Sequence, residues 1–99
     1  MKLALDFDET ITRDPLFWAA FIHLARGSKH EVTIVTSRPL SHYKVTGYND
    51  DIEAFAKEAN VPIIYCDGNP KRMYYKADVW IDDTPESIPS YSDVHEITG

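Results

Sequence analysis

A chain of 99 residues is long enough for one domain and too short for a separate substrate-covering domain, so we expect residues 1–99 to fold as a single unit. Hydrophobic residues make up 43% of the chain and charged residues 26%, a balance typical of folded globular proteins. The formal net charge of −6 argues against general nucleic-acid binding and against attraction to an anionic membrane surface. The first apolar run is interrupted by Asp6 and Asp8, which does not suit a secretory signal. We therefore expect a cytoplasmic protein that does not associate with a membrane.

The first half of the chain alternates short apolar runs with helical patterns. Apolar side chains recur at helical spacing after an Asp-Pro pair and occupy more than one side of that helix, so we expect it to be heavily buried. The polar stretch that follows the second β-branched run predicts a long loop. The predicted elements are a strand at Lys2–Phe7, a helix that begins at Pro15 and stops before Gly27, a strand at Glu31–Thr36 and a loop at Ser37–Asn49.

The second half continues the same alternation. The expected elements are a helix from Asp50 or Asp51 to Ala59, a strand at Val61–Cys66, a short helix at Lys71–Lys76, a strand at Asp78–Ile81, a helical turn at Thr84–Glu86 and a fifth strand at Ser92–Ile97. Strands that alternate with helices predict an α/β fold with a parallel sheet of four to five strands and right-handed crossovers.

Polar side chains gather where the predicted strands end, and in such folds ligands bind at the carboxyl ends of the strands. They are Asp6, Asp8, Thr36, Ser37, Asp67, Asp82 and Asp83. A single Asp at such a place is most simply a turn residue. Two pairs of Asp on strand ends favour a site for an oxygen-loving cation such as Mg²⁺. On a regular strand, Asp6 and Asp8 would share one face.

Four segments at these strand ends resemble the motifs of the haloacid dehalogenase-like (HAD) phosphohydrolases. They are LDFDET after the first strand, IVTSR at the second, the lysine of NPKR, and VWIDD at the fourth, in the order of the family from Leu3 to Thr84. The resemblance implies a three-layer α/β/α Rossmann-like domain. It also implies Mg²⁺-dependent cleavage of a phosphomonoester through an aspartyl-phosphate. The short connections leave no room for a cap domain, so the capless members are the better match.

The resemblance also implies a role for each matching residue. Asp6 is expected to attack phosphorus. Asp8 is expected to protonate the leaving oxygen and then to deprotonate the attacking water. Lys71, which we prefer over Lys76, is expected to neutralise the nucleophile and the phosphate. The remaining assignments are Thr36 for a phosphoryl oxygen; Thr10 for support of the loop that carries Asp8; Thr10, Ser37 and Arg38 for the substrate; and Asp6, the Asp8 backbone carbonyl, Asp82 and Asp83 for Mg²⁺.

The substrate and the partners stay open at this stage. A phosphorylated small molecule is the first expectation, and an open site also admits a phosphorylated macromolecule. Either Ser37–Asn49 or a second subunit in a homodimer could cover the site. Two other classes remain as alternatives: a phospho-accepting signalling receiver with Asp67 as acceptor, and a binding module that keeps the Mg²⁺ site without turnover. A receiver is disfavoured because no lysine follows the last predicted strand.

Overall fold

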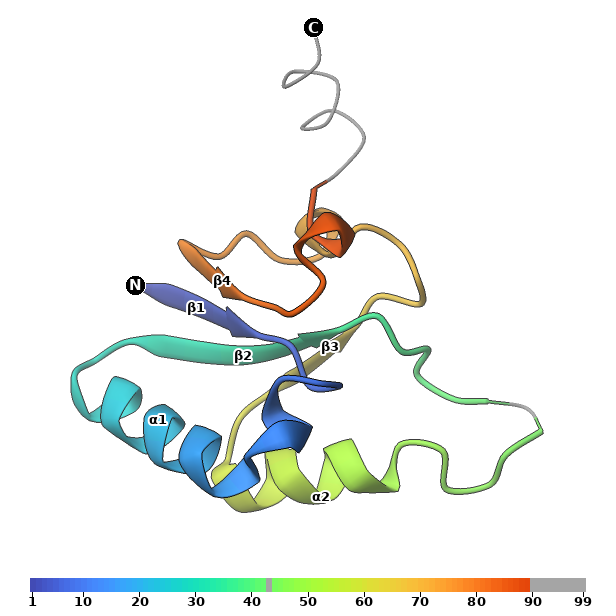
Figure 1. Cartoon of the computed structure of the whole chain (residues 1–99), viewed down its shortest axis with the longest axis horizontal. Helices are drawn as coiled ribbons and strands as arrows, with labels where there is room; N and C mark the ends of the chain where they lie inside the picture. Colours follow the sequence, from blue (N-terminus) through green and yellow to red (C-terminus); the bar gives the residue numbers. More distant parts are fainter. Residues whose placement is uncertain (43, 90–99) are drawn as a thin grey trace, which may run out of the picture.

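A computed structural model describes residues 1–42 and 44–89 of the chain (Figure 1). Its regular elements are β1 (Lys2–Leu5), α1 (Pro15–Gly27), β2 (Glu31–Thr36), α2 (Asp50–Ala59), β3 (Ile63–Tyr65) and β4 (Val79–Ile81). The four strands form one parallel sheet in the order β3-β2-β1-β4. The predicted α/β fold with a parallel sheet is thus confirmed. The fifth strand predicted at Ser92–Ile97 lies outside the described residues.

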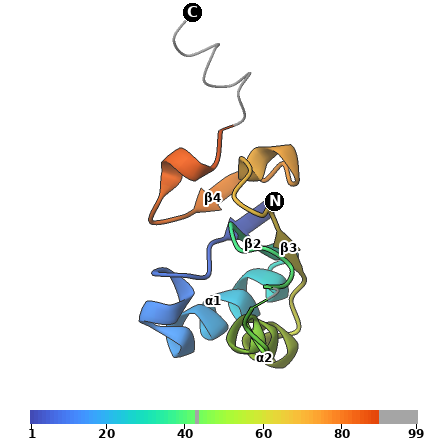
Figure 2. The same cartoon turned by 90° about the vertical axis from the view of Figure 1, so that its right-hand side faces the viewer.

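Both α-helices lie on the same face of the sheet (Figure 2). The steps from β1 to β2 and from β2 to β3 run in one direction across the sheet, so right-handed crossovers bring both helices to one side. The main core lies between these helices and the sheet and includes Leu5, Ile22, Ile34 and Ile52, which are almost fully buried. Among the described residues, neither helix has the length and apolar character required to cross a membrane.

The segment between β3 and β4 returns across the other face of the sheet. It packs Tyr75 and Ala77 against a smaller core that contains Ala4, Val35 and Cys66. The short helix predicted at Lys71–Lys76 is wrong in extent, because only a 3-10 turn at Lys71–Met73 (η2) forms. After this turn the chain must run on to the start of β4 while covering the sheet, which leaves no length for further helical turns.

The burial expected for α1 is also wrong. Asp14 caps the helix as predicted, since its Oδ1 accepts a hydrogen bond from the Phe17 N–H at 3.2 Å, and Pro15 occupies the first turn. Only Ile22 and Ala25 are buried along the helix, whereas Leu24 is 71% exposed. A sheet face receives one stripe of a helix, and the apolar residues of α1 extend beyond that stripe.

Helix α2 matches its predicted face. Ile52 and Ala56 are buried, and Phe55 and Ala59 pack against the same core. Its last turn ends at Asn60, which adopts the left-handed conformation with φ of 56°.

Two neighbouring strands set the position of the candidate site. β1 and β4 are paired in parallel, with Leu5 opposite Ile81. The Asp6 N–H donates to the Ile81 carbonyl at 3.0 Å, which extends this pairing by one residue. Asp6 and Asp82 therefore leave the sheet side by side.

Candidate functional site

Three carboxylates meet where β1 and β4 end. Asp6, Asp82 and Asp83 each offer one carboxylate oxygen, and these oxygens lie within 4.8 Å of one another. Asp6 is 8% exposed, and the Asp82 side chain is 2% exposed. The structure thus brings together three of the four residues expected to hold Mg²⁺.

In the described part of the chain, the cation that contacts this carboxylate cluster is the side-chain ammonium of Lys71. Its Nζ donates to Asp6 Oδ1 at 2.9 Å and to Asp82 Oδ2 at 2.5 Å, and its side chain is buried. Turn η2 directs it there across 65 residues of sequence separation from Asp6. Lys76, the alternative in the sequence, lines a depression with Lys2 and Asp78 at the opposite end of the strands, where β1 and β4 begin.

The charges of the cluster do not balance. Three carboxylates face one ammonium, so two negative charges remain when all groups are ionised. The pKa of Asp6 is raised to about 7, and burial is the largest cause. Lys71 opposes this rise, whereas the neighbouring Asp83 and Asp82 contribute to it. Burial by itself lowers the pKa of Lys71, but its hydrogen bonds to Asp82 and Asp6 outweigh that effect and raise it. A divalent cation with oxygen ligands fits both the donor atoms and the missing charge.

Two neighbours orient the Asp82 carboxylate. The Thr84 N–H donates to Asp82 Oδ1 at 2.9 Å. The Ser87 hydroxyl lies 3.5 Å from Asp82 Oδ2 and donates to the Thr84 carbonyl at 2.7 Å. Both come from the turn after β4, where Pro85–Ser87 form a 3-10 helix (η3). Ser87 was not predicted as a site residue, because nothing in the motif marks a serine five residues beyond the aspartate.

The loop after β1 separates Asp6 from Asp8. The strand ends at Leu5, so the expectation that both carboxylates share one strand face is wrong. Glu9 has φ of 62°, in the left-handed region that side chains other than glycine adopt uncommonly, and its N–H donates to the Thr12 hydroxyl at 2.9 Å. The Thr10 hydroxyl lies 3.5 Å from Asp6 Oδ2, and the Thr10 N–H donates to the Phe7 carbonyl. Thr10 thus contacts both the candidate nucleophile and the loop.

The end of β2 carries the candidate hydroxyl groups. Thr36 is fully buried, and its Oγ1 accepts a hydrogen bond from the Arg38 N–H at 3.2 Å. Ser37 is exposed, and its carbonyl accepts from the Gly68 N–H at 2.8 Å. The Asp67 N–H donates to the Arg38 carbonyl at 3.1 Å, which joins the turn after β3 to the loop after β2.

Asp8 lies outside the carboxylate cluster. Its side chain is 51% exposed and forms an ion pair with Arg38, whose Nη2 lies 2.7 Å from Asp8 Oδ1. Arg38 forms a second ion pair with Asp51 in the first turn of α2. We expected Arg38 to contact substrate from its place in the motif, and Asp51 was not predicted as a site residue. A signal was present in the pair of acidic residues at the start of α2, but helix capping explained that pair equally well.

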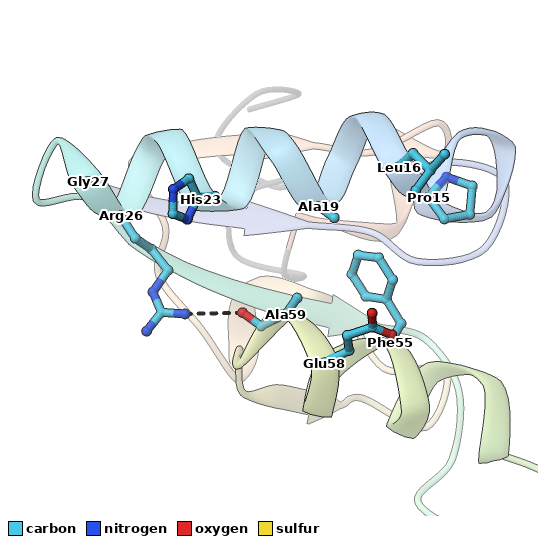
Figure 3. A pocket seen from close by; sticks show the side chains of 9 residues that line it. All are labelled: Pro15, Leu16, Ala19, His23, Arg26, Gly27, Phe55, Glu58 and Ala59. Carbon is cyan, nitrogen blue, oxygen red and sulfur yellow. Dashed lines mark hydrogen bonds between the residues drawn. The ribbon is translucent and has the colours of Figure 1, made fainter.

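A separate groove lies between α1 and α2 (Figure 3). It has a volume of about 640 Å³, and Leu16, Ala19 and Phe55 give it apolar walls. Arg26 closes one end, where its Nη1 donates to the carbonyls of Ala59 and Asn60. None of the clustered carboxylates lines this groove, so its place in the fold is distinct from theirs.

Comparisons of the chain with protein-family models, with curated proteins and with solved structures find no significant match.

Proposed function

We propose that the chain is a capless, Mg²⁺-dependent phosphohydrolase of the HAD type. The observation that carries this proposal is the Asp6 carboxylate, which contacts Lys71 on one side and lies beside Asp82 and Asp83 on the other. Three of the four motifs that resemble the family contain these four residues. The finer features of the fold, three layers without a cap, belong to the same proposal.

The donor set fits a divalent cation, because it offers hard oxygen ligands with two negative charges in excess. The residues that would hold it are Asp6, Asp82 and Asp83, together with the backbone carbonyl of Asp8. When bound, Mg²⁺ supplies charge neutralisation at the phosphate and keeps the nucleophilic carboxylate ionised.

The reaction proceeds in two steps carried by residues of this chain. In the first step a carboxylate oxygen of Asp6 attacks phosphorus; the bond from phosphorus to the leaving oxygen breaks while Asp8 gives its proton to that oxygen. In the second step Asp8 takes a proton from water as the water oxygen attacks phosphorus, which breaks the bond to Asp6 and releases inorganic phosphate. Lys71 offsets negative charge next to the attacking carboxylate, and Thr36 provides a hydroxyl for a phosphoryl oxygen.

We further propose a phosphorylated small molecule as the substrate, with the end of a phosphorylated macromolecule as the second choice because the site lacks a cap. The receiver alternative has less support. Its acceptor would be Asp67, which is exposed and does not belong to the carboxylate cluster found in the described residues.

The test is steady-state turnover of 4-nitrophenyl phosphate with Mg²⁺. Asp6→Asn should abolish turnover, because an amide is a poor nucleophile. Asp67→Asn is the matched control, because it removes another carboxylate at a strand end and should leave the rate unchanged. Asp8→Asn should slow turnover steeply while Mg²⁺ binding is retained. A single phosphorylation of Asp67 without turnover would replace the proposal with the receiver, and Mg²⁺ binding without any phosphoryl transfer would replace it with the binding module.

A further inference from the structure

Arg38 connects three segments of the chain through its guanidinium group. Its Nε and Nη2 donate to the two oxygens of Asp8 at 3.0 and 2.7 Å. Its Nη1 and Nη2 donate to the two oxygens of Asp51 at 2.7 and 3.0 Å. Nη1 also lies 3.4 Å from Asn49 Oδ1. A guanidinium has five N–H donors in a fixed plane, and these contacts use all of them.

Two aromatic rings fix the position of the same group. The guanidinium carbon lies 5.2 Å from the centre of the Phe7 ring and 5.7 Å from the centre of the Tyr48 ring. The Arg38 side chain is only 15% exposed, whereas those of Asp8 and Asp51 are more than half exposed. Because the guanidinium is planar, rotation that breaks the fork to Asp51 also moves the fork to Asp8.

The structure assigns Arg38 and Asp51 as positioning residues for Asp8. Asp51, at the start of α2, orients the Arg38 fork, and the fork holds the Asp8 carboxylate in the loop that follows Asp6. This inference rests on the proposed function, since only there does Asp8 transfer protons. Arg38 takes one lone pair of each Asp8 oxygen, which leaves a second one on each oxygen for the proton that is transferred.

In an open site, the Asp8 side chain needs a contact within the domain that holds it in one orientation. Asp8 is half exposed and belongs to a loop, so its side chain would otherwise sample several rotamers. Proton transfer needs the acid or base within hydrogen-bond reach of the reacting oxygen. In enzymes with a cap, closure can position such a group. Here the start of α2 does so from within the domain.

The experiment compares Asp51→Asn with Asp50→Asn. Both positions lie in the first turn of α2, so both variants remove the same charge from the same helix end. Of the two, only Asp51 contacts Arg38. An asparagine at position 51 keeps a side-chain oxygen that can accept the hydrogen bond that the Ile52 N–H now donates to Asp51 Oδ1. The turnover rate of 4-nitrophenyl phosphate with Mg²⁺ is measured for each variant, together with the amount of phosphoenzyme present after an acid quench.

The expected result for Asp51→Asn is a kcat lowered about 10- to 100-fold, with KM for this small substrate nearly unchanged. Phosphoenzyme should accumulate, because the nitrophenolate leaves without help from an acid whereas the attack of water depends on Asp8. A merely structural loss would lower phosphoenzyme and turnover together. Arg38→Lys, which keeps the charge without the two-sided fork, should behave like Asp51→Asn.

Two outcomes overturn the inference in different ways. If the wild-type chain turns over and Asp51→Asn matches Asp50→Asn in kcat and in phosphoenzyme level, the positioning role is wrong while the proposed function stands. If the wild-type chain forms no phosphoenzyme and shows no turnover, the proposed function fails and this inference fails with it.

Discussion

Removal of the buried ammonium should strongly destabilise the protein. In Lys71→Met the chain loses a cation that lies 2.9 Å from Asp6 Oδ1 and 2.5 Å from Asp82 Oδ2, with all three side chains at most 9% exposed. At an effective dielectric constant of about 20, each of these contacts has a gross Coulomb energy of about 6 kcal/mol, which the cost of desolvation largely offsets. The variant keeps that cost for the carboxylates and loses the attraction. Deletion of one partner of a buried ion pair typically lowers the free energy of unfolding by about 3–5 kcal/mol, so we expect that loss here.

Urea unfolding followed by tryptophan fluorescence, without Mg²⁺, measures this loss as a fall of the midpoint by about 1 M or more. Lys76→Met is the control, since it replaces an exposed lysine five positions along the same connection and should change the free energy of unfolding by less than about 0.5 kcal/mol. Mg²⁺ should then restore more stability to Lys71→Met than to the wild type, because three carboxylates without the ammonium attract the cation more strongly. Equal midpoints for the two lysine variants would refute the account of the cluster as a charged group that Lys71 partly neutralises.

Three further outcomes test other parts of the structure. The raised pKa of Asp6 means that the folded chain binds its proton more tightly than the unfolded chain, so metal-free stability should decrease as the pH rises through about 7. A proton on Asp6 competes with a cation, and Mg²⁺ should therefore raise Tm more at pH 8 than at pH 6; an equal rise at both would contradict this. Burial raises the pKa of Cys66 to about 11, so a thiol reagent at pH 8 should label it only after unfolding, and rapid labelling of the folded chain would count against its burial. Ile22→Ala should lower the free energy of unfolding by about 2–5 kcal/mol and Leu24→Ala by less than about 0.5 kcal/mol, since Ile22 is 1% exposed and Leu24 is 71% exposed; similar losses in urea unfolding would show that α1 buries a different face.

Local sequence patterns predicted most of the fold, and the errors in that prediction come from tertiary requirements. β2 has its predicted bounds, because a run of β-branched residues between polar ones marks both ends. β1 ends two residues before its predicted end, since the chain must turn away at Asp6 to form the site loop. The apolar residues of α1 predicted burial on several sides, but a pattern of apolar residues does not tell how many surfaces a helix contacts. The extent of η2 could not be predicted from the sequence either, because the distance that the chain must cover to reach β4 determines where this turn ends.

The candidate site was partly predictable because parallel strands converge. The rule that the carboxyl ends of parallel strands meet at one side of the sheet predicts that Asp6 and Asp82 lie close together, and the order of the motifs adds a lysine to them. The choice between Lys71 and Lys76 needed the path of the chain between β3 and β4. The link from Arg38 to Asp51 spans 13 positions across a polar loop, and no periodicity marks such a contact.

The two aspartates of the first motif differ in surroundings far more than their spacing suggests. Asp6 is buried and faces Lys71 with the other carboxylates, whereas Asp8 is half exposed and faces Arg38 on the side of α2. Each therefore has its own cation, held by a different element of the fold. A nucleophile must stay ionised beside a phosphate, while a group that transfers protons must reach both solvent and the leaving oxygen. A turn that buries one carboxylate and exposes the next within two residues meets both needs, so the geometry of this loop fits the proposed hydrolysis better than it fits storage of a phosphoryl group.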